Sequence, residues 1–186
     1  MPLILTFILF TIIILWIIGL YNRMVKLKNR RENAFADIDV QLKQRHDLVP
    51  QLVDTVKGYA THEKELLTRI TEARTSAMQA TSIDEKINAE KGLSSALQGL
   101  KVAVENYPDL KANQNFLHLQ EELSDIENKL AAARRFFNIA TTEYNNAVET
   151  FPANIVASQF GFKRATLFDL GNEIREDLDI PPTINF

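Results

Sequence analysis

The apolar and polar positions divide the chain into a long apolar start and a body with heptad-spaced apolar residues. No charged side chain occurs in residues 2–21, and thirteen of the sixteen residues from Leu3 to Ile18 are Leu, Ile or Phe. Because an α-helix rises about 1.5 Å per residue, roughly 20 apolar residues cross a hydrocarbon core about 30 Å thick. Residues 1–22 are therefore predicted to be a transmembrane anchor.

The apolar start is read as a permanent anchor and not as a cleaved signal peptide. A signal peptide has a basic n-region, a short apolar core and a small-x-small cleavage site. Here no Lys or Arg precedes the apolar run, which is longer than such a core, and no A-x-A sequence follows it directly. The alternative is a buried core helix, but such a helix seldom lacks charge over so long a stretch.

A basic juxtamembrane segment, residues 23–31, follows the anchor directly. Its positive residues are Arg23, Lys26, Lys28, Arg30 and Arg31. Positive charge marks the cytoplasmic side of a span, so the N-terminus is expected outside and the body in the cytoplasm. The five basic residues are expected to contact anionic lipid headgroups, with Trp16 and Tyr21 at the membrane boundary.

The body, residues 32–170, has two stretches of apolar residues spaced three and four apart and no alternation typical of a strand. The first stretch comprises Phe35, Ile38, Leu42, Arg45, Val49, Leu52, Val56 and Tyr59. The second comprises Leu119, Leu123, Ile126, Leu130, Ala133, Phe137, Ala140, Tyr144, Ala147 and Phe151. Such spacing predicts helices packed at shallow angles. The expected fold is all-α: a single-pass transmembrane helix that continues into an elongated antiparallel bundle of about four helices.

Two weaker helices are expected between these stretches, at about residues 62–79 and 82–104. Ser82 and Glu85 have the spacing of a capping box at the start of the second one. The residue before a proline avoids the α conformation, so Tyr107-Pro108 should interrupt the chain before the long helix.

Phe151-Pro152 should end the long helix for the same reason. Asn154 is expected to cap a short last helix that stops at Gly161. Residues 171–186 form an acidic C-terminal tail.

Two residues in the first heptad stretch leave alternatives open. Pro50 lacks an N–H group, so it either kinks the helix or starts a new helix after a break at about Val49. Arg45 occupies a position where an apolar residue is expected. It either extends to solvent at the edge of the bundle or forms a buried, register-setting ion pair with an acid such as Glu122 or Glu127.

Composition narrows the chemistry that the chain can perform. There is no Cys, and the three His are far apart. His62-Glu63 begins an H-E-x-x-H pattern, but Leu66 replaces the second His. No phosphate loop, nucleophile–base set or paired-carboxylate pattern stands out. We therefore expect no enzyme activity, no cofactor, no metal and no small-molecule substrate.

The distribution of charge points away from nucleic acid as a partner. The net charge is −3, but the five positive residues of the basic segment leave the rest of the chain strongly acidic. An acidic body lacks the basic patch that nucleic-acid binding requires.

One face of the second heptad stretch is rich in uncharged polar residues, and residues 136–148 contain Glu143 as their one charge. The candidate interface residues, opposite the apolar seam, are Asn128, Arg135, Asn138, Thr142 and Asn145. Amide and hydroxyl groups suit contact with another protein because they bring no charge to desolvate. The alternative is packing against another helix of the same chain.

Several motifs, in order along the chain, resemble those of one family. They are RHDLVPQLVDTVKGYATHE (45–63), YPDLKAN (107–113), IENKLAAARRFFN (126–138), Tyr144-Asn145 and FPANIVASQFGF (151–162). The chain is identified by them as a member of the LemA family, although Phe137-Asn138 replaces the Tyr-Asn that is common there. The resemblance implies a single-pass bacterial inner-membrane protein with a helical cytoplasmic domain and no agreed enzymatic activity. In this family, one relative is associated with the formation of magnetosome membranes, and some members are associated with membrane proteases.

The expected function is a membrane-anchored scaffold or adaptor that self-associates at the cytoplasmic face of a bacterial membrane. Its expected partners are membrane lipids and further copies of the chain. The alternative is a regulatory subunit of a membrane protease or of an envelope-stress complex.

Overall fold

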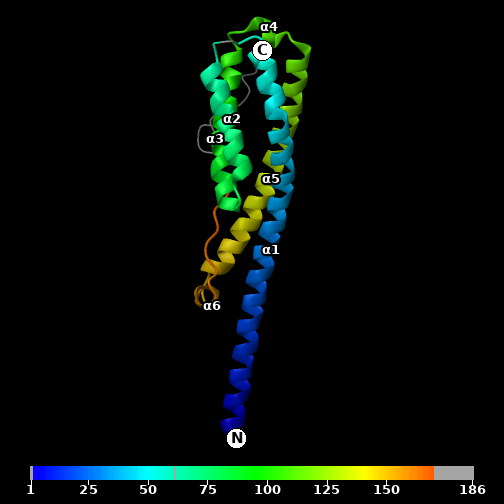
Figure 1. Cartoon of the computed structure of the whole chain (residues 1–186). Coiled ribbons are helices and arrows are strands. Elements are labelled where there is room, and N and C mark those ends of the chain that lie inside the picture. Colours follow the sequence, from blue (N-terminus) through cyan, green and yellow to red (C-terminus); the bar gives the residue numbers. More distant parts are fainter. Residues whose placement is uncertain (1, 61, 170–186) are drawn as a thin grey trace, which may run out of the picture. The chain divides into compact units, whose positions relative to one another are not determined.

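The computed structural model describes residues 2–60 and 62–169, which form six helices and no strand (Figure 1). The helices are α1 Pro2–Lys57, α2 Lys64–Gln79, α3 Ile83–Val104, α4 Pro108–Lys111, α5 Gln114–Glu149 and α6 Ala153–Gln159. The all-α prediction is confirmed. The acidic tail predicted from residue 171 lies outside the described residues.

Helix α1 continues from the apolar start through the basic segment and the first heptad stretch. Pro50 lies inside the helix, so a break at Val49 is excluded. The predicted seam from Phe35 to Val56 is buried at every position. Tyr59 is the exception, because it follows the end of α1 and its side chain is exposed.

The chain divides into two compact units, each with its own apolar cluster. Unit 1 comprises residues 1–39 and 131–167, and so contains the first part of α1, the second part of α5, and α6. Of the described residues, unit 2 comprises 40–60, 62–130 and 168–169, and contains the remainder of α1 and α5 together with α2, α3 and α4. The long helices α1 and α5 contribute to both units.

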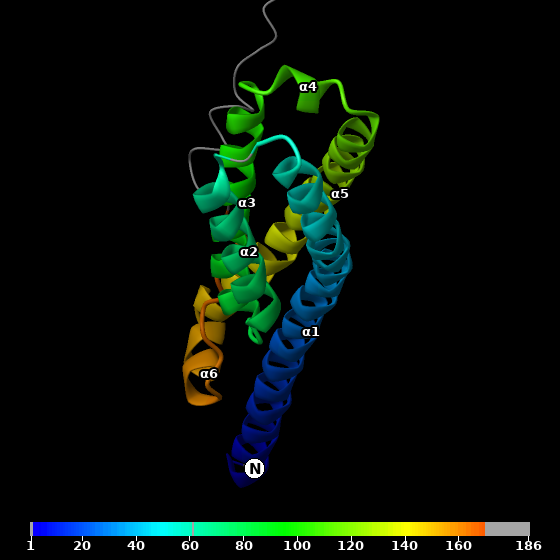
Figure 2. The same ribbon diagram turned by 45° about the horizontal axis from the view of Figure 1, so that its top comes forward.

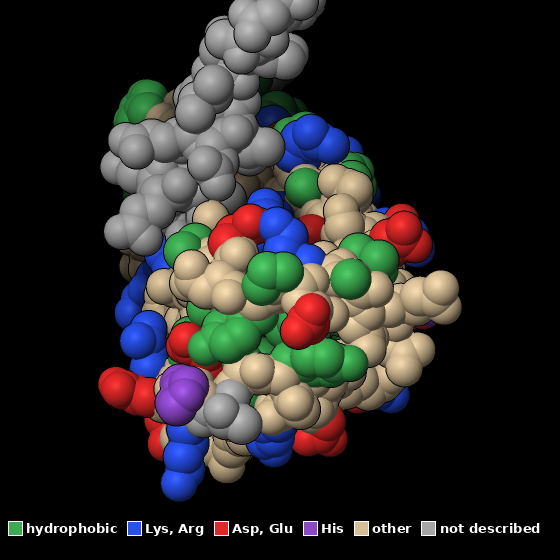
Figure 3. Space-filling model, turned by 90° about the horizontal axis from the view of Figure 1, so that it is seen from above, with side chains coloured by type: hydrophobic (Ala, Val, Ile, Leu, Met, Phe, Trp, Pro, Cys, Tyr) green, Lys and Arg blue, Asp and Glu red, His purple; other side chains and the backbone are tan. Residues whose placement is uncertain are grey.

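The core of unit 2 is built from all five of its helices or their flanks. Helices α2 and α3 lie side by side in both views, and α4 connects the end of α3 to the start of α5 (Figures 1 and 2). The most buried apolar residues of the core are Val49, Val56, Ile70, Leu93, Leu110 and Phe116. At the end of unit 2 that carries α4, apolar side chains reach the surface between polar and charged ones (Figure 3).

The predicted capping box opens α3. The Ser82 hydroxyl accepts from the backbone N–H of Glu85 at 3.2 Å. The Glu85 carboxylate accepts from the backbone N–H groups of Ser82 and Thr81, at 3.1 and 3.0 Å. Because these hydrogen bonds favour the charged form, they lower the pKa of Glu85 to about 2.

The core of unit 1 joins α1 to α5 and α6. Its buried residues are Met24, Tyr144, Val148, Val156 and Ala157, with Ile17, Leu20, Leu27, Ala153, Phe162 and Ala165 packed against them. The Phe35 and Phe137 rings also meet edge to face, with centroids 5.4 Å apart. Burial raises the pKa of Tyr144, whose hydroxyl donates to the Lys163 carbonyl at 2.9 Å.

Two predictions at the end of α5 are wrong. Phe151 does not continue the apolar seam: α5 ends at Glu149, and the side chain of Phe151 is 76% exposed. Asn154 does not cap the last helix, because it lies inside α6, where Pro152 holds the N-cap position. Gly161, just beyond α6, has a φ of 74°, which glycine adopts without a steric penalty.

Candidate functional site

The apolar start of α1 is the one helix segment among the described residues that is long and apolar enough to cross a membrane. No residue of its most apolar part is buried within the chain. Trp16 is exposed, as a membrane-facing side chain must be. Tyr21 is also exposed on one side, but its ring contacts Phe160 and Phe162 edge to face.

The basic segment of α1 divides into two groups. Arg23, Lys26 and Lys28 are exposed, as a contact with lipid headgroups requires. Arg31 instead serves the protein interior: its guanidinium donates to the Thr141 hydroxyl and the Thr166 carbonyl, each at 3.3 Å.

The Arg31 guanidinium also lies 4.9 Å from the centroid of the Phe137 ring. Arg30 forms an ion pair with Glu143 on α5, although both side chains keep substantial exposure. The expectation that all five basic residues face lipid is therefore wrong for Arg31, whose donors bind partners in the same chain.

The candidate interface on α5 is only partly exposed. Asn128, Arg135 and Thr142 are exposed, and Asn138 is partly buried. Asn145 is 5% exposed. Its side chain donates to the Ala165 carbonyl at 2.9 Å and accepts from the Ala165 N–H at 2.8 Å. Asn145 therefore holds the segment after α6 against α5 through two hydrogen bonds within the chain. The prediction that it belongs to a protein interface is wrong.

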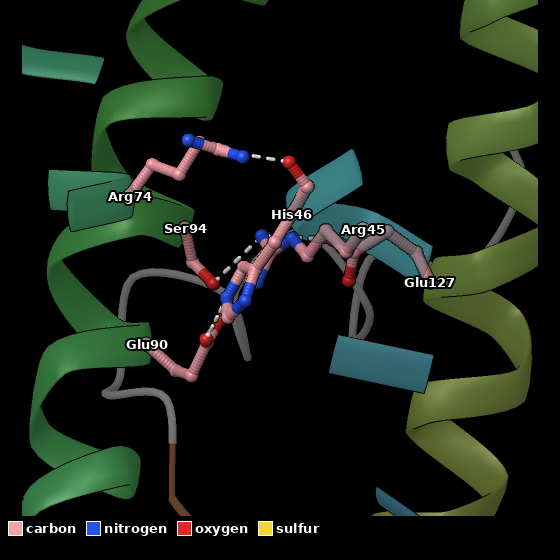
Figure 4. A network of polar contacts seen from close by, with 6 residues as sticks. All are labelled: Arg45, His46, Arg74, Glu90, Ser94 and Glu127. Atoms are coloured by element: carbon pink, nitrogen blue, oxygen red, sulfur yellow. Dashed lines mark hydrogen bonds and ion pairs between the residues drawn. The ribbon is translucent and has the colours of Figure 1, made fainter. Parts of the chain in front are cut away.

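A buried polar network lies at the centre of unit 2 (Figure 4). Arg45, on α1, pairs with Glu90 on α3 at 3.0 Å and with Glu127 on α5 at 2.8 Å. The Arg45 guanidinium also donates to the Ser94 hydroxyl at 3.0 Å. The side chains of Arg45 and Glu90 are 4% and 1% exposed. Of the two alternatives for Arg45, the buried pair is therefore correct, and Glu127 is one of its partners.

His46 extends this network to a fourth helix. Its Nε2 lies 2.6 Å from the second carboxylate oxygen of Glu90. Arg74, on α2, donates to the His46 carbonyl at 2.7 Å. One charged cluster thus links α1, α2, α3 and α5 (Figure 4). It favours one register of α1, α3 and α5, because a shift of any of these three helices would separate paired charges. Helix α2 is attached by the Arg74 hydrogen bond to a backbone carbonyl.

Glu90 was not among the predicted partners of Arg45, although the sequence contains a signal for it. Glu90 stands at helical spacing between Ile87 and Leu93, both buried, just as Arg45 stands between Leu42 and Val49. Opposite charges at seam positions of two helices indicate a buried pair. Glu122, the other acid considered for Arg45, instead lies 3.4 Å from His118 on the surface of α5.

The arrangement offers no evident catalytic chemistry. Within residues 2–60 and 62–169, no group of three His, Asp or Glu side chains is placed to hold a metal ion. Glu63, which follows His62, accepts a hydrogen bond from the Tyr107 hydroxyl at 3.1 Å. Desolvation and this carboxylate raise the pKa of Tyr107. The His62-Glu63 pair thus belongs to a helix connection, where Glu63 ties the start of α2 to the segment before α4.

Comparison with known proteins places this set of helices in one family. The profile of the LemA family matches residues 34–186. The chain belongs to the LemA family. The match includes the buried Arg45 and His46, the α5 seam and the Phe151–Phe162 segment, and begins after the apolar start of α1.

One relative of this LemA-family chain extends the match toward the N-terminus, because its alignment covers more of the chain than the profile does. Protein LemA of Metamycoplasma hominis is 29% identical in an alignment of 182 positions that covers 93% of this chain and 82% of that protein. Magnetosome protein MamQ 1 of Paramagnetospirillum magneticum and Magnetosome protein MamQ of Magnetospirillum gryphiswaldense are each 23% identical over 80% of this chain. The match spans 64% of the length of each MamQ protein.

Proposed function

We propose that this protein is a non-catalytic scaffold, anchored in the membrane by the start of α1, that self-associates through the exposed face of α5. The observation that carries the proposal is a stripe on α5 within unit 1. Its residues, all exposed, are Ala132, Arg135, Ile139, Thr142 and Asn146. We call this set the α5 stripe.

The α5 stripe has the spacing of a helix-packing seam, although it faces away from the core. Its members follow one another at steps of three and four, the steps by which one helix presents a continuous face to another. Arg135 is its single charged residue, and Ile139 is 56% exposed. A solvated face more often carries several Lys and Glu residues, so this composition favours contact with a second helix.

The stripe revises the interface predicted from the sequence. Ile139 replaces Asn138, Asn146 replaces Asn145, and Ala132 takes the place of Asn128, which lies in unit 2. Arg135 and Thr142 remain. A second copy of α5 is the partner to which we commit, because two such stripes can pack together without burying an acid.

Membrane anchoring supports this proposal by raising the local concentration of the chain. Copies held in one plane meet at a higher effective concentration than free copies, so a modest contact suffices for assembly. We further propose that the body lies in the cytoplasm of a bacterial cell, on the side of the basic residues Arg23, Lys26 and Lys28. Relatives named as magnetosome proteins fit a function at a membrane.

The test is the mass of the full-length protein in mild detergent and in lipid nanodiscs, with and without Ile139→Lys. A like charge from each copy would meet in a desolvated contact, which costs several kcal/mol. Each 1.4 kcal/mol is about tenfold in the association constant, so the assemblies should dissociate at least tenfold more readily.

Val40→Lys is the matched control, because Val40 is also a β-branched helix residue that is 56% exposed. It should leave both the assemblies and the helicity unchanged. Assemblies that survive Ile139→Lys, or a wild-type protein that is monomeric in lipid, would contradict the proposal. A stoichiometric membrane protein that replaces the second copy would favour the adaptor alternative.

A further inference from the structure

The chain reversal between α5 and the segment after α6 exposes large apolar side chains at one place in unit 1. Phe151 is 76% exposed, Ile155 is 61% exposed and Phe160 is 55% exposed. They lie before, within and directly after the seven-residue helix α6. We propose that this segment, residues 151–160, is a second membrane contact that lies in the interface between lipid headgroups and acyl chains.

The position of the segment in unit 1 supports lipid as its partner. The Phe160 and Phe162 rings meet the Tyr21 ring, with centroids 5.0 and 5.6 Å apart. Val156 and Ala157, on the other face of α6, belong to the cluster that packs against Ile17 and Leu20 of α1. The exposed apolar side chains are thus held beside the last residues of the candidate span.

The length of α1 determines how deep in the bilayer the exposed apolar side chains of residues 151–160 lie. From Pro2 to Tyr21 a helix extends about 28 Å, close to the thickness of a hydrocarbon core. Figure 1 shows α1 continuing beyond α6 as its free N-terminal stretch. When that stretch crosses the bilayer, Tyr21 lies at the boundary, and α6 lies beside it.

Positive charge near the segment matches anionic headgroups. Lys163 follows α6 and is exposed. Arg23 is exposed as well and lines, with Phe151 and Ala153, a cavity of about 400 Å³ in unit 1. Among the described residues, the one acid that lines this cavity, Glu143, pairs with Arg30. Apolar residues flanked by basic ones are typical of segments that lie in the membrane interface without crossing it.

The chain has no Cys, so single cysteines can carry a fluorescent probe. We would label Ile155→Cys in the full-length protein with an environment-sensitive dye. The protein would be reconstituted at one copy per nanodisc, in equimolar phosphatidylcholine and phosphatidylglycerol. A nitroxide on the upper acyl chain of a trace lipid then reports proximity to the bilayer by quenching the dye.

The matched control is Val40→Cys, another exposed apolar position. It stands 19 residues beyond Tyr21 on the same helix, about 28 Å along the axis. We expect a blue-shifted emission and strong nitroxide quenching for residue 155, and neither for residue 40.

Two results would overturn the proposal. An unshifted, unquenched dye at residue 155 would show that the segment is in water. A blue shift that appears only when several copies share one membrane, without lipid quenching, would show that a second copy covers the segment. The expected result is read at one copy per nanodisc, so it is independent of whether the α5 stripe self-associates. A second sample with several copies per membrane tests only whether another copy covers the segment.

Discussion

At the scale of single residues, the buried network shows how charge specifies a helical core. Burying Arg45 and Glu90 is costly, and their attraction is strong only when the geometry is good and the remaining polar atoms are satisfied. Here most are satisfied, but the Nε of Arg45 and the Oε1 of Gln41 are buried without a partner. The network is therefore better explained as a device that fixes the helix register than as a large net source of stability.

This view predicts an asymmetry between single and double substitutions. Arg45→Met should destabilise the protein by about 3–5 kcal/mol, because the buried Glu90 carboxylate loses its arginine partner and keeps only the contact with His46. Arg45→Met combined with Glu90→Leu should recover most of that loss, since the stranded charge is removed. Chemical unfolding of the full-length protein in mild detergent, followed by circular dichroism, measures both.

The control for this series is Lys43→Met, at an exposed position on the same helix, which should change the free energy of unfolding by less than about 0.5 kcal/mol. A double variant that is as unstable relative to the wild type as Arg45→Met alone would show that the pair contributes net stability, contrary to our view.

The sequence allowed part of this network to be predicted. The charge of Arg45 at an apolar seam position indicated a buried ion pair, and the heptad stretch on α5 offered Glu127 as one possible partner. The partner with the least exposure, Glu90, was missed because the period of α3 is less regular, with Ser94 and Gly92 close to the seam. Which acids meet Arg45 depends on how four helices pack together, and no single-helix pattern contains that information.

At the scale of elements, α5 separates a core face from an exposed face along one helix. Leu130 and Phe137 are 2% and 0% exposed, whereas Phe136 and Ile139 are 46% and 56% exposed. Heptad spacing predicted the core face well, because burial follows the helical period wherever both flanks are covered. It failed at Phe151, because Pro152 ended the helix and removed that residue from the seam.

The register of α5 can be tested by truncating side chains on its two faces. Ile126→Ala and Leu130→Ala should each cost about 2–5 kcal/mol, because they leave cavities in a buried seam. Leu123→Ala should cost less, since Leu123 is only partly buried. Lys129→Ala removes only an exposed ion pair with Asp125 and should cost under about 0.5 kcal/mol. Equal losses at Leu130 and Lys129 in the same unfolding measurement would refute this register.

Element ends were harder to predict than element faces. The capping box of Ser82 and Glu85 was predicted correctly because both partners are local in sequence. The clamp of Asn145 on Ala165 joins residues twenty apart, so it looked like an exposed polar position. The same holds for Arg31, whose partners on α5 and after α6 are distant in the chain.

At the scale of the whole molecule, the distribution of positive charge should decide which side of the membrane holds the body. A basic residue near a span resists translocation and is attracted to anionic headgroups. Both effects are weaker when the residue is paired with an acid or a carbonyl within the fold. Among the five predicted positions, Arg31 is engaged inside unit 1 and Arg30 pairs with Glu143. Lys28 also pairs with Glu32 at 3.8 Å, but that pair is exposed and lies on the surface of α1. Arg23, Lys26 and Lys28 are thus the residues that should retain the body in the cytoplasm in the folded protein.

Topology can be measured with a phosphatase that is active only outside the cytoplasm, fused after Phe186. The wild-type fusion should be inactive, while a fluorescent protein at the same place should be bright. Replacing Arg23, Lys26 and Lys28 by Gln and adding Lys residues before the span should export a fraction of the fusions, because the charge bias is then reversed. Adding the Lys residues alone should have a smaller effect. A phosphatase active in the wild-type fusion would place the body outside, and the α5 stripe would then have to meet its partner on that side of the membrane.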